Sequence, residues 1–105
     1  MYNNKNEILS FLKQMKQELK DQGIISLGLF GSIAKETNTQ LSDIDIVYET
    51  SDKFIEKYRG WSAFSYLNTH LRNKVEDRFK THVDMFDLNS SSPFKEKIQK
   101  EALYV

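Results

Sequence analysis

The stretch LFGSIAKETNTQLSDIDIVYE, from Leu29 to Glu49, constrains this chain more than any other part of it. An apolar run ends in Gly31-Ser32, a mostly polar loop follows, and two aspartates then alternate with isoleucines in a second apolar run. Side chains alternate between the two faces of a strand. We therefore expect Asp43 and Asp45 to project to one side, while the intervening isoleucines point into the core.

Two carboxylates held side by side repel each other. Asp43 and Asp45 would lie about 6.5 to 7 Å apart at the backbone. Two unit charges about 5 Å apart repel by roughly 3 kcal/mol at an effective dielectric constant near 20. A small domain rarely retains that cost without a cation, and Mg²⁺ is commonly held by one or two carboxylates together with substrate phosphates. The pair predicts a metal site; taken alone, it is equally an acidic exposed strand face.

Gly31-Ser32 supplies the complementary half of a nucleotide site. Glycine after a strand allows a tight turn and the close approach of a ligand to the backbone. Free N–H groups at the start of the next helix favour an anion such as phosphate, and Ser32 adds a hydroxyl donor. Taken alone, the dipeptide is more often an ordinary strand-to-helix turn with a serine cap. Beside metal-binding carboxylates, it predicts a nucleoside triphosphate site.

A third carboxylate is expected on the strand THVDMFDL, residues 81–88. Asp84 and Asp87 would lie on opposite faces of this strand, and Val83 looks like a core residue. We therefore favour Asp84 as the third acidic ligand and interpret Asp87 as a solvated or turn-forming residue. His82 lies on the Asp84 face and could approach a metal, but a lone histidine is more often a surface or structural residue.

Hydrophobic periodicity predicts the remaining elements. We expect a helix over 4–21 ending at Gly23, strands over 24–30 and 42–48, one or two helical turns from 32 to about 37, two helices within 52–80 separated at Arg59-Gly60, and a final helix with Ser92 as N-cap, Pro93 at its first position and Phe94, Ile98 and Ala102 facing inward. The first two strands are expected to pair. This order predicts an α/β (α+β) fold in which helices flank a small mixed sheet.

Composition excludes several other classes of protein. With 105 residues, 39% of them hydrophobic, the chain can bury one core, so we predict a single domain over 1–105. Fifteen basic residues balance fifteen acidic ones, which argues against general nucleic-acid binding. The chain has no cysteine for disulfides or zinc, and no apolar run for a signal peptide or a membrane span. We expect a cytoplasmic location.

The quoted motif, GSIAKETNTQLSDIDIVYE, resembles the Gly-Ser and Ser-Asp-x-Asp pattern of the DNA polymerase β-like nucleotidyltransferase superfamily. Ser32 and Asp43 are eleven positions apart, a spacing typical of its minimal nucleotidyltransferase branch, and HVDMFDL is similar to the later strand of that branch. The resemblance covers almost the whole chain. It implies the polymerase β-like nucleotidyltransferase fold. It also implies Mg-dependent transfer of a nucleotidyl group, AMP from ATP or another nucleoside triphosphate, to an acceptor hydroxyl.

The resemblance also implies roles for individual residues. Carried over by position, Gly31, Ser32 and Lys35 bind the triphosphate, Asp43 and Asp45 bind two Mg²⁺ ions, and Asp84 binds the catalytic ion and activates the acceptor. The family often has Arg-Gly where this chain has Lys35-Glu36. Lys35 keeps a positive charge, whereas Glu36 adds a negative charge and lacks the backbone freedom of glycine. This departure bears on triphosphate affinity more than on the fold.

Members of this branch are commonly paired with a small helical HEPN protein, often as antitoxin and toxin. The resemblance therefore implies a HEPN-type toxin as partner and acceptor, with a homo-oligomer as the other expected assembly. The alternative function is that of a catalytically degenerate antitoxin that occludes its partner. Intact Asp43, Asp45 and Asp84 favour the enzyme, whereas Glu36 and the lack of an acceptor-binding domain favour the alternative. Three aromatic residues are candidates for an interface: Trp61, Tyr66 and Tyr104.

Overall fold

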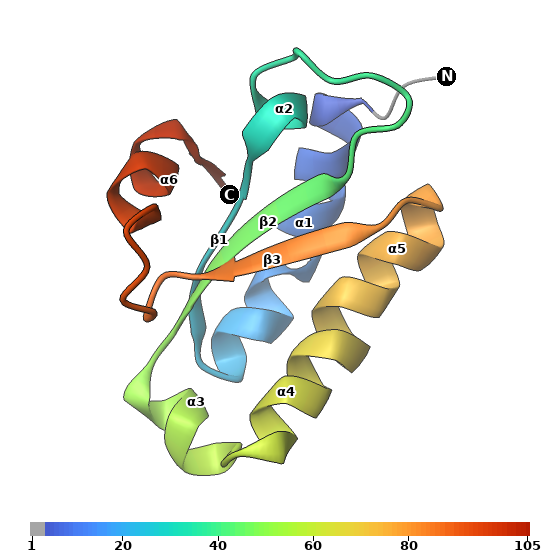
Figure 1. Cartoon of the computed structure of the whole chain (residues 1–105). Coiled ribbons are helices and arrows are strands. Elements are labelled where there is room, and N and C mark those ends of the chain that lie inside the picture. Colours follow the sequence, from blue (N-terminus) through green and yellow to red (C-terminus); the bar gives the residue numbers. More distant parts are fainter. Residues whose placement is uncertain (1–3) are drawn as a thin grey trace.

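The computed structural model describes residues 4–105 (Figure 1). The helices are α1 (Lys5–Asp21), α2 (Gly31–Ala34), α3 (Asp52–Lys57), α4 (Trp61–Leu67), a π-helical turn η1 (Asn68–Arg72), α5 (Asn73–Phe79) and α6 (Lys95–Glu101). The strands are β1 (Ile24–Phe30), β2 (Ile44–Thr50), β3 (Val83–Asp87) and β4 (Leu103–Tyr104). The sheet has the order β3-β2-β1-β4. Because β1 is antiparallel to β2 and β4 while β2 is parallel to β3, the predicted mixed sheet is confirmed.

Helices cover both faces of this sheet (Figure 1). On one face, α1 and the segment from α4 to α5 bury the larger core, to which β2 contributes Ile44 and Ile46. On the other face, Ile98 of α6 packs with Val47 of β2 and with Leu88. Side chains alternate along a strand, so Asp45 lies on the same face as Val47. The aspartate thus points away from the larger core, as predicted.

The first helix begins and ends for identifiable reasons. Asn4 is its N-cap, and the Asn4 side chain accepts a hydrogen bond from the N–H of Glu7 at 3.1 Å. At the other end, Gly23 has a φ of +106°, which L side chains rarely adopt. A Cβ atom at Gly23 would also lie 2.8 Å from the Cβ of Phe54. The predicted stop at Gly23 is therefore confirmed.

The helical region between β2 and β3 divides at Gly60, as predicted, where a φ of +55° precedes α4. Tyr66 is buried in the larger core, so its prediction as an interface residue is wrong. Trp61 and Phe64 are 79% and 53% exposed, and their rings stack at a centroid distance of 5.0 Å.

Among residues 4–105, none of the helices combines the length and the apolar character that crossing a membrane requires.

The C-terminal segment differs from the prediction in three ways. Helix α6 begins at Lys95, because Ser92 instead closes a turn ahead of it by accepting the Phe94 N–H at 3.2 Å. Pro93, directly after Ser92, suits the second position of a turn as well as the first position of a helix, so the sequence does not distinguish the two. Phe94 was predicted to face inward but is 64% exposed, whereas Ile98 is buried. Strand β4 was not predicted, since two residues have no periodicity.

Candidate active site

Asp43 and Asp45 flank Ile44, the first residue of β2. The predicted strand started two residues earlier, so Asp43 precedes the strand instead of lying within it. Ile44 is fully buried, and its N–H donates to the carbonyl oxygen of His82 at 3.0 Å. These contacts anchor the backbone between the two aspartates. Asp43 is exposed to solvent, and Asp45 is partly buried.

Asp84 lies beside Asp45 because β2 and β3 pair in parallel with these two residues in register. A carboxylate oxygen each from Asp43 and Asp84 and a ring nitrogen of His82 all lie within 4.8 Å of one another. Asp87 is at the other end of β3, where one of its carboxylate oxygens accepts the N–H of Asn89 at 2.8 Å. The structure thus brings Asp84 to the aspartate pair and leaves Asp87 at the far end of β3, where its side chain bonds to the turn that follows.

Gly31 connects β1 to α2 at the same edge of the sheet. Its φ of +78° lies in the left-handed region, which favours glycine. The preceding residue, Phe30, is the register partner of Asp45 in the β1–β2 ladder. A Cβ atom at Gly31 would collide with the Asp45 carboxylate. We expected glycine here for close approach of a ligand, and the structure shows that the Asp45 carboxylate also lies close to this position.

The three carboxylates influence one another electrostatically. Burial, and then the nearby charges of Asp84 and Asp43, raise the pKa of Asp45 from 3.8 to about 6. A cation among these groups would reverse the effect, because it stabilises the ionised carboxylates. All three residues offer the oxygen ligands that Mg²⁺ prefers. The donor set therefore fits the metal that the motif implies.

Replacing Asp45 with asparagine is expected to change the pH dependence of stability in metal-free protein. Because the folded pKa of Asp45 is about 6 and its ordinary value is 3.8, the folded protein retains a proton that the unfolded chain has lost between these values. This contribution to stability is complete below about pH 4 and is lost as the pH rises through about 6. Two pKa units correspond to about 3 kcal/mol. Water screens a partly exposed group, so we expect about 1 kcal/mol.

Urea unfolding in EDTA, from about pH 4 to about pH 8, measures this difference. Relative to the Asp45→Asn variant, the wild-type protein should lose stability as the pH rises across this range. Asp77→Asn is a matched control, because Asp77 is an exposed aspartate on α5, and it should follow the wild-type profile. Parallel profiles for the wild type and Asp45→Asn would contradict the raised pKa of Asp45.

The predicted phosphate ligands of α2 differ in their surroundings. Ser32 lies in the first turn, and its carbonyl oxygen accepts the N–H of Thr37 at 2.9 Å. The ammonium group of Lys35 lies 3.1 Å from a carboxylate oxygen of Glu101 in α6. A triphosphate would have to compete with this carboxylate for Lys35. Both side chains are partly exposed, so the competing ion pair is weak.

Glu36 occupies a backbone position that suits glycine. Its φ of +60° is in the left-handed region, which explains why the related motif has glycine there. The Glu36 carboxylate lies 3.4 Å from the ammonium group of Lys5, at the start of α1. The negative charge that departs from the family pattern therefore has a partner on α1.

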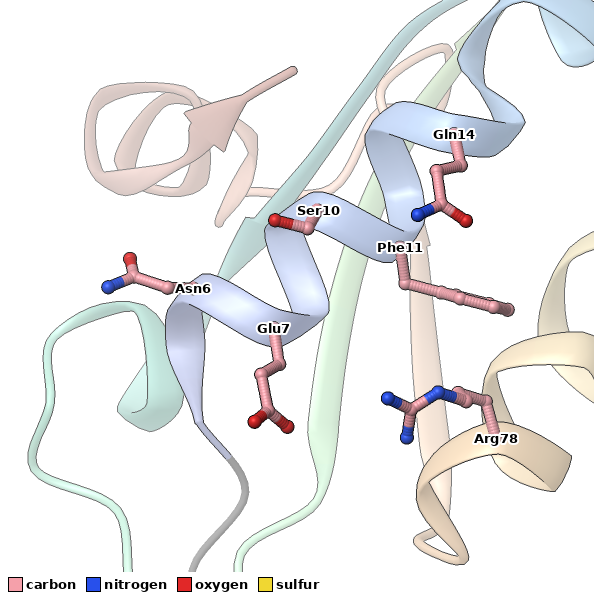
Figure 2. A pocket seen from close by; sticks show the side chains of 6 residues that line it. All are labelled: Asn6, Glu7, Ser10, Phe11, Gln14 and Arg78. Carbon is pink, nitrogen blue, oxygen red and sulfur yellow. The ribbon is translucent and has the colours of Figure 1, made fainter.

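Three surface hollows formed by residues 4–105 lie away from the carboxylates, and none is lined by Asp43, Asp45 or Asp84. One of about 380 Å³ lies between α1 and α5 and is lined by Asn6, Glu7, Ser10, Phe11, Gln14 and Arg78. Figure 2 shows Arg78 of α5 below Phe11 of α1 at the side of this hollow. The lining has one carboxylate and no acidic pair, so it does not resemble a Mg²⁺ site. The candidate site is instead an open cluster at the sheet edge.

Glu76 is a neighbour of the site that sequence analysis missed. It belongs to α5, and one of its carboxylate oxygens lies 3.4 Å from a ring nitrogen of His82. The surrounding sequence, RNKVEDRFK, is typical of a solvated helix face with mixed charges. No local pattern distinguishes Glu76 from its neighbours, because the contact depends on how α5 packs beside β3.

The family model described as polymerase beta, nucleotidyltransferase matches residues 13–105. The chain belongs to this nucleotidyltransferase family. Three proteins of Methanocaldococcus jannaschii, each named a putative protein adenylyltransferase (MJ0126, MJ1217 and MJ1379), are 31%, 30% and 32% identical to it over 103 residues. Each alignment covers 95% of this nucleotidyltransferase chain and 96% of the relative.

Solved structures show the same nucleotidyltransferase fold. A structure named a putative minimal nucleotidyltransferase has a TM-score of 0.70 at 17% identity, and the match covers 96% of this chain and 95% of the other. A chain from a crystal structure of a toxin-antitoxin with AMP-PNP has a TM-score of 0.62 at 23% identity, covering 97% of this chain and 72% of the other. The predictions of this family, this fold and a nucleotidyltransferase enzyme are confirmed.

Proposed function

We propose that this nucleotidyltransferase moves an adenylyl group from ATP to a hydroxyl group of a protein in a Mg-dependent reaction. The observation that carries the proposal is the convergence of Asp43, Asp45 and Asp84 at the sheet edge where Gly31 opens α2. The three relatives named as protein adenylyltransferases support AMP as the transferred group and a protein as the acceptor.

Asp43, Asp45 and Asp84 would hold two Mg²⁺ ions. When bound, Mg²⁺ neutralises triphosphate charge and makes the acceptor hydroxyl more acidic. In the reaction, the acceptor oxygen forms a bond to the α-phosphorus of ATP. The bond between the α-phosphorus and the oxygen that bridges to the β-phosphate breaks, and pyrophosphate leaves. Asp84, the more exposed carboxylate of the Asp45–Asp84 pair, would accept the proton of the acceptor hydroxyl. Gly31 and Ser32 would position the triphosphate at the start of α2.

For the partner, we propose a HEPN-type toxin that is also the acceptor. The proposal rests on the family resemblance, and the fold shared with a chain of a toxin-antitoxin structure containing AMP-PNP is consistent with it. The carboxylate cluster is open, so the acceptor protein itself can supply the enclosing surface. Trp61 and Tyr104, 79% and 46% exposed, are apolar surface available to a partner.

ATP binding is expected to depend on both the metal and the aspartate pair. Phosphate oxygens complete the coordination of a Mg²⁺ ion held by carboxylates, so Mg²⁺ should tighten ATP binding at least about tenfold. Isothermal titration calorimetry with Mg²⁺, and then with EDTA, measures the effect. The Asp43→Asn/Asp45→Asn variant should bind ATP with no such difference.

Asp77→Asn is the control for loss of one acidic charge, and it should retain the full Mg²⁺ effect. Equal ATP affinity of the wild type in Mg²⁺ and in EDTA would show that the carboxylates are not metal ligands. The proposed function would then be wrong.

A further inference from the structure

His82 lies between two carboxylates at the edge of the site. Its Nε2 atom is 3.1 Å from Oδ1 of Asp84, and its Nδ1 atom is 3.4 Å from Oε2 of Glu76. The same Glu76 oxygen accepts the N–H of Val83 at 3.0 Å, which ties the middle of α5 to the start of β3. The imidazole ring therefore connects an anchored carboxylate of α5 to a carboxylate of the candidate metal site.

We propose that His82 is a positioning residue that orients Asp84 for metal binding. The inference rests on the proposed function, because it takes Asp84 to be a metal ligand. The side chain of Asp84 is 56% exposed, so nothing in the core restricts its rotamer. A hydrogen bond from His82 to Oδ1 holds the carboxylate and leaves Oδ2 for a cation. Partners of this kind typically change metal affinity 10- to 100-fold in other proteins.

The geometry favours a positioning role over direct metal ligation by His82. A ring nitrogen must offer its lone pair to bind a metal. Both ring nitrogens of His82 instead face carboxylate oxygens, which accept hydrogen bonds and do not donate them. The ring acts on the metal through Asp84, with Glu76 holding its far side.

The backbone of His82 contributes to the same arrangement. Its carbonyl oxygen accepts the N–H of Ile44, the residue between Asp43 and Asp45. The ring and the backbone of one residue thus contact all the segments that carry the three acidic residues. A substitution at position 82 retains the backbone bond and removes only the contacts of the ring.

Mn²⁺ binding, followed by electron paramagnetic resonance, tests the proposal without turnover. The protein is saturated with α,β-methylene-ATP, which cannot release pyrophosphate, and titrated with Mn²⁺ at constant pH. We expect His82→Ala to lower the affinity for the Mn²⁺ ion that depends on Asp84 by at least about tenfold. His82→Gln, whose amide can reach Asp84 from the Nε2 position, should recover much of this loss. His82→Asn, whose amide corresponds to Nδ1 and faces Glu76, should not.

Two further variants separate positioning from general damage to the fold. Asp84→Asn defines the loss that removal of the ligand causes, and the His82→Ala/Asp84→Asn double variant should show no additional loss. His70→Ala replaces the other histidine of the chain, which is partly buried and stacks on Tyr66, and it should bind Mn²⁺ as the wild type does. Thermal unfolding of each variant establishes that it is folded.

Unchanged or tighter Mn²⁺ binding by folded His82→Ala would overturn the positioning role while leaving the proposed function intact. Additive losses in the double variant, or equal binding by His82→Gln and His82→Asn, would show that His82 does not act through Asp84. Absence of nucleotide-dependent Mn²⁺ binding by the wild-type protein would instead overturn the proposed function, and the inference with it.

Discussion

Asp84→Asn is expected to reduce transfer of label from α-labelled ATP to a protein acceptor by at least about 10³-fold. The amide cannot accept the proton of the acceptor hydroxyl and is a weaker ligand for a cation, and several kcal/mol of transition-state stabilisation depend on these roles. ATP binding should remain within a few-fold of the wild type, because Asp43 and Asp45, as proposed, would still hold a cation for the triphosphate. Labelling of the proposed toxin, separated on a gel, measures transfer, and calorimetry measures binding.

Two controls make this result specific. γ-Labelled ATP should leave the acceptor unlabelled, and pyrophosphate should accumulate in proportion to the α-label, because the α-phosphorus is the centre attacked. Asp87→Asn changes the other aspartate of β3, at the opposite end of the strand from the site, and should retain transfer. Label arriving from the γ position would disprove the mechanism. Full neutralisation of a toxin by a variant lacking all three acidic ligands would favour the alternative, an antitoxin acting by occlusion.

Gly31→Ala adds only one methyl group, but it is expected to disrupt the site strongly. A side chain at this position adopts a left-handed conformation and collides with the Asp45 carboxylate. We expect a stability loss of about 1 to 3 kcal/mol. We also expect ATP binding to lose its dependence on Mg²⁺, because Asp45 has to move. Urea unfolding and calorimetry with ATP measure the two effects.

Gly60→Ala is the matched control for the backbone. Gly60 also has a positive φ, but a Cβ atom there meets no heavy atom within 4 Å. This variant should lose stability for conformational reasons and still bind ATP in a Mg-dependent manner. If Gly31→Ala and Gly60→Ala affect ATP binding equally, the contact between Gly31 and Asp45 has no role in the site.

The position of Glu36 illustrates how a departure from the family motif can be tolerated. Sequence comparison alone presents Glu36 as a lost glycine and an added negative charge. The structure retains the left-handed backbone that glycine would favour and places the carboxylate beside Lys5. An ion pair at an exposed site stabilises by at most about 1 kcal/mol, similar to the cost of the left-handed conformation. The departure therefore leaves the turn after α2 in place.

Local patterns in the sequence determined most of the helices and strands, and also the part of the candidate site that lies on β2. Apolar residues at helical spacing predicted α1, and the glycine after it marked its end. Strand alternation predicted that Asp45 faces away from the isoleucines of β2, because the period of two is a property of any extended backbone. These features depend only on residues a few positions apart in the chain, so they can be predicted from the sequence alone.

Only the tertiary structure decided which distant residues meet. Asp84 reaches Asp45 because residues 51–82 cross over and return β3 parallel to β2, in a register that no local pattern specifies. The same packing places Glu76 against His82, pairs Lys35 with Glu101 and leaves Phe94 in solvent. Each of these outcomes depends on the position of one whole element relative to another. Burial across the entire chain sets those positions, and the spacing of residues along any one segment does not.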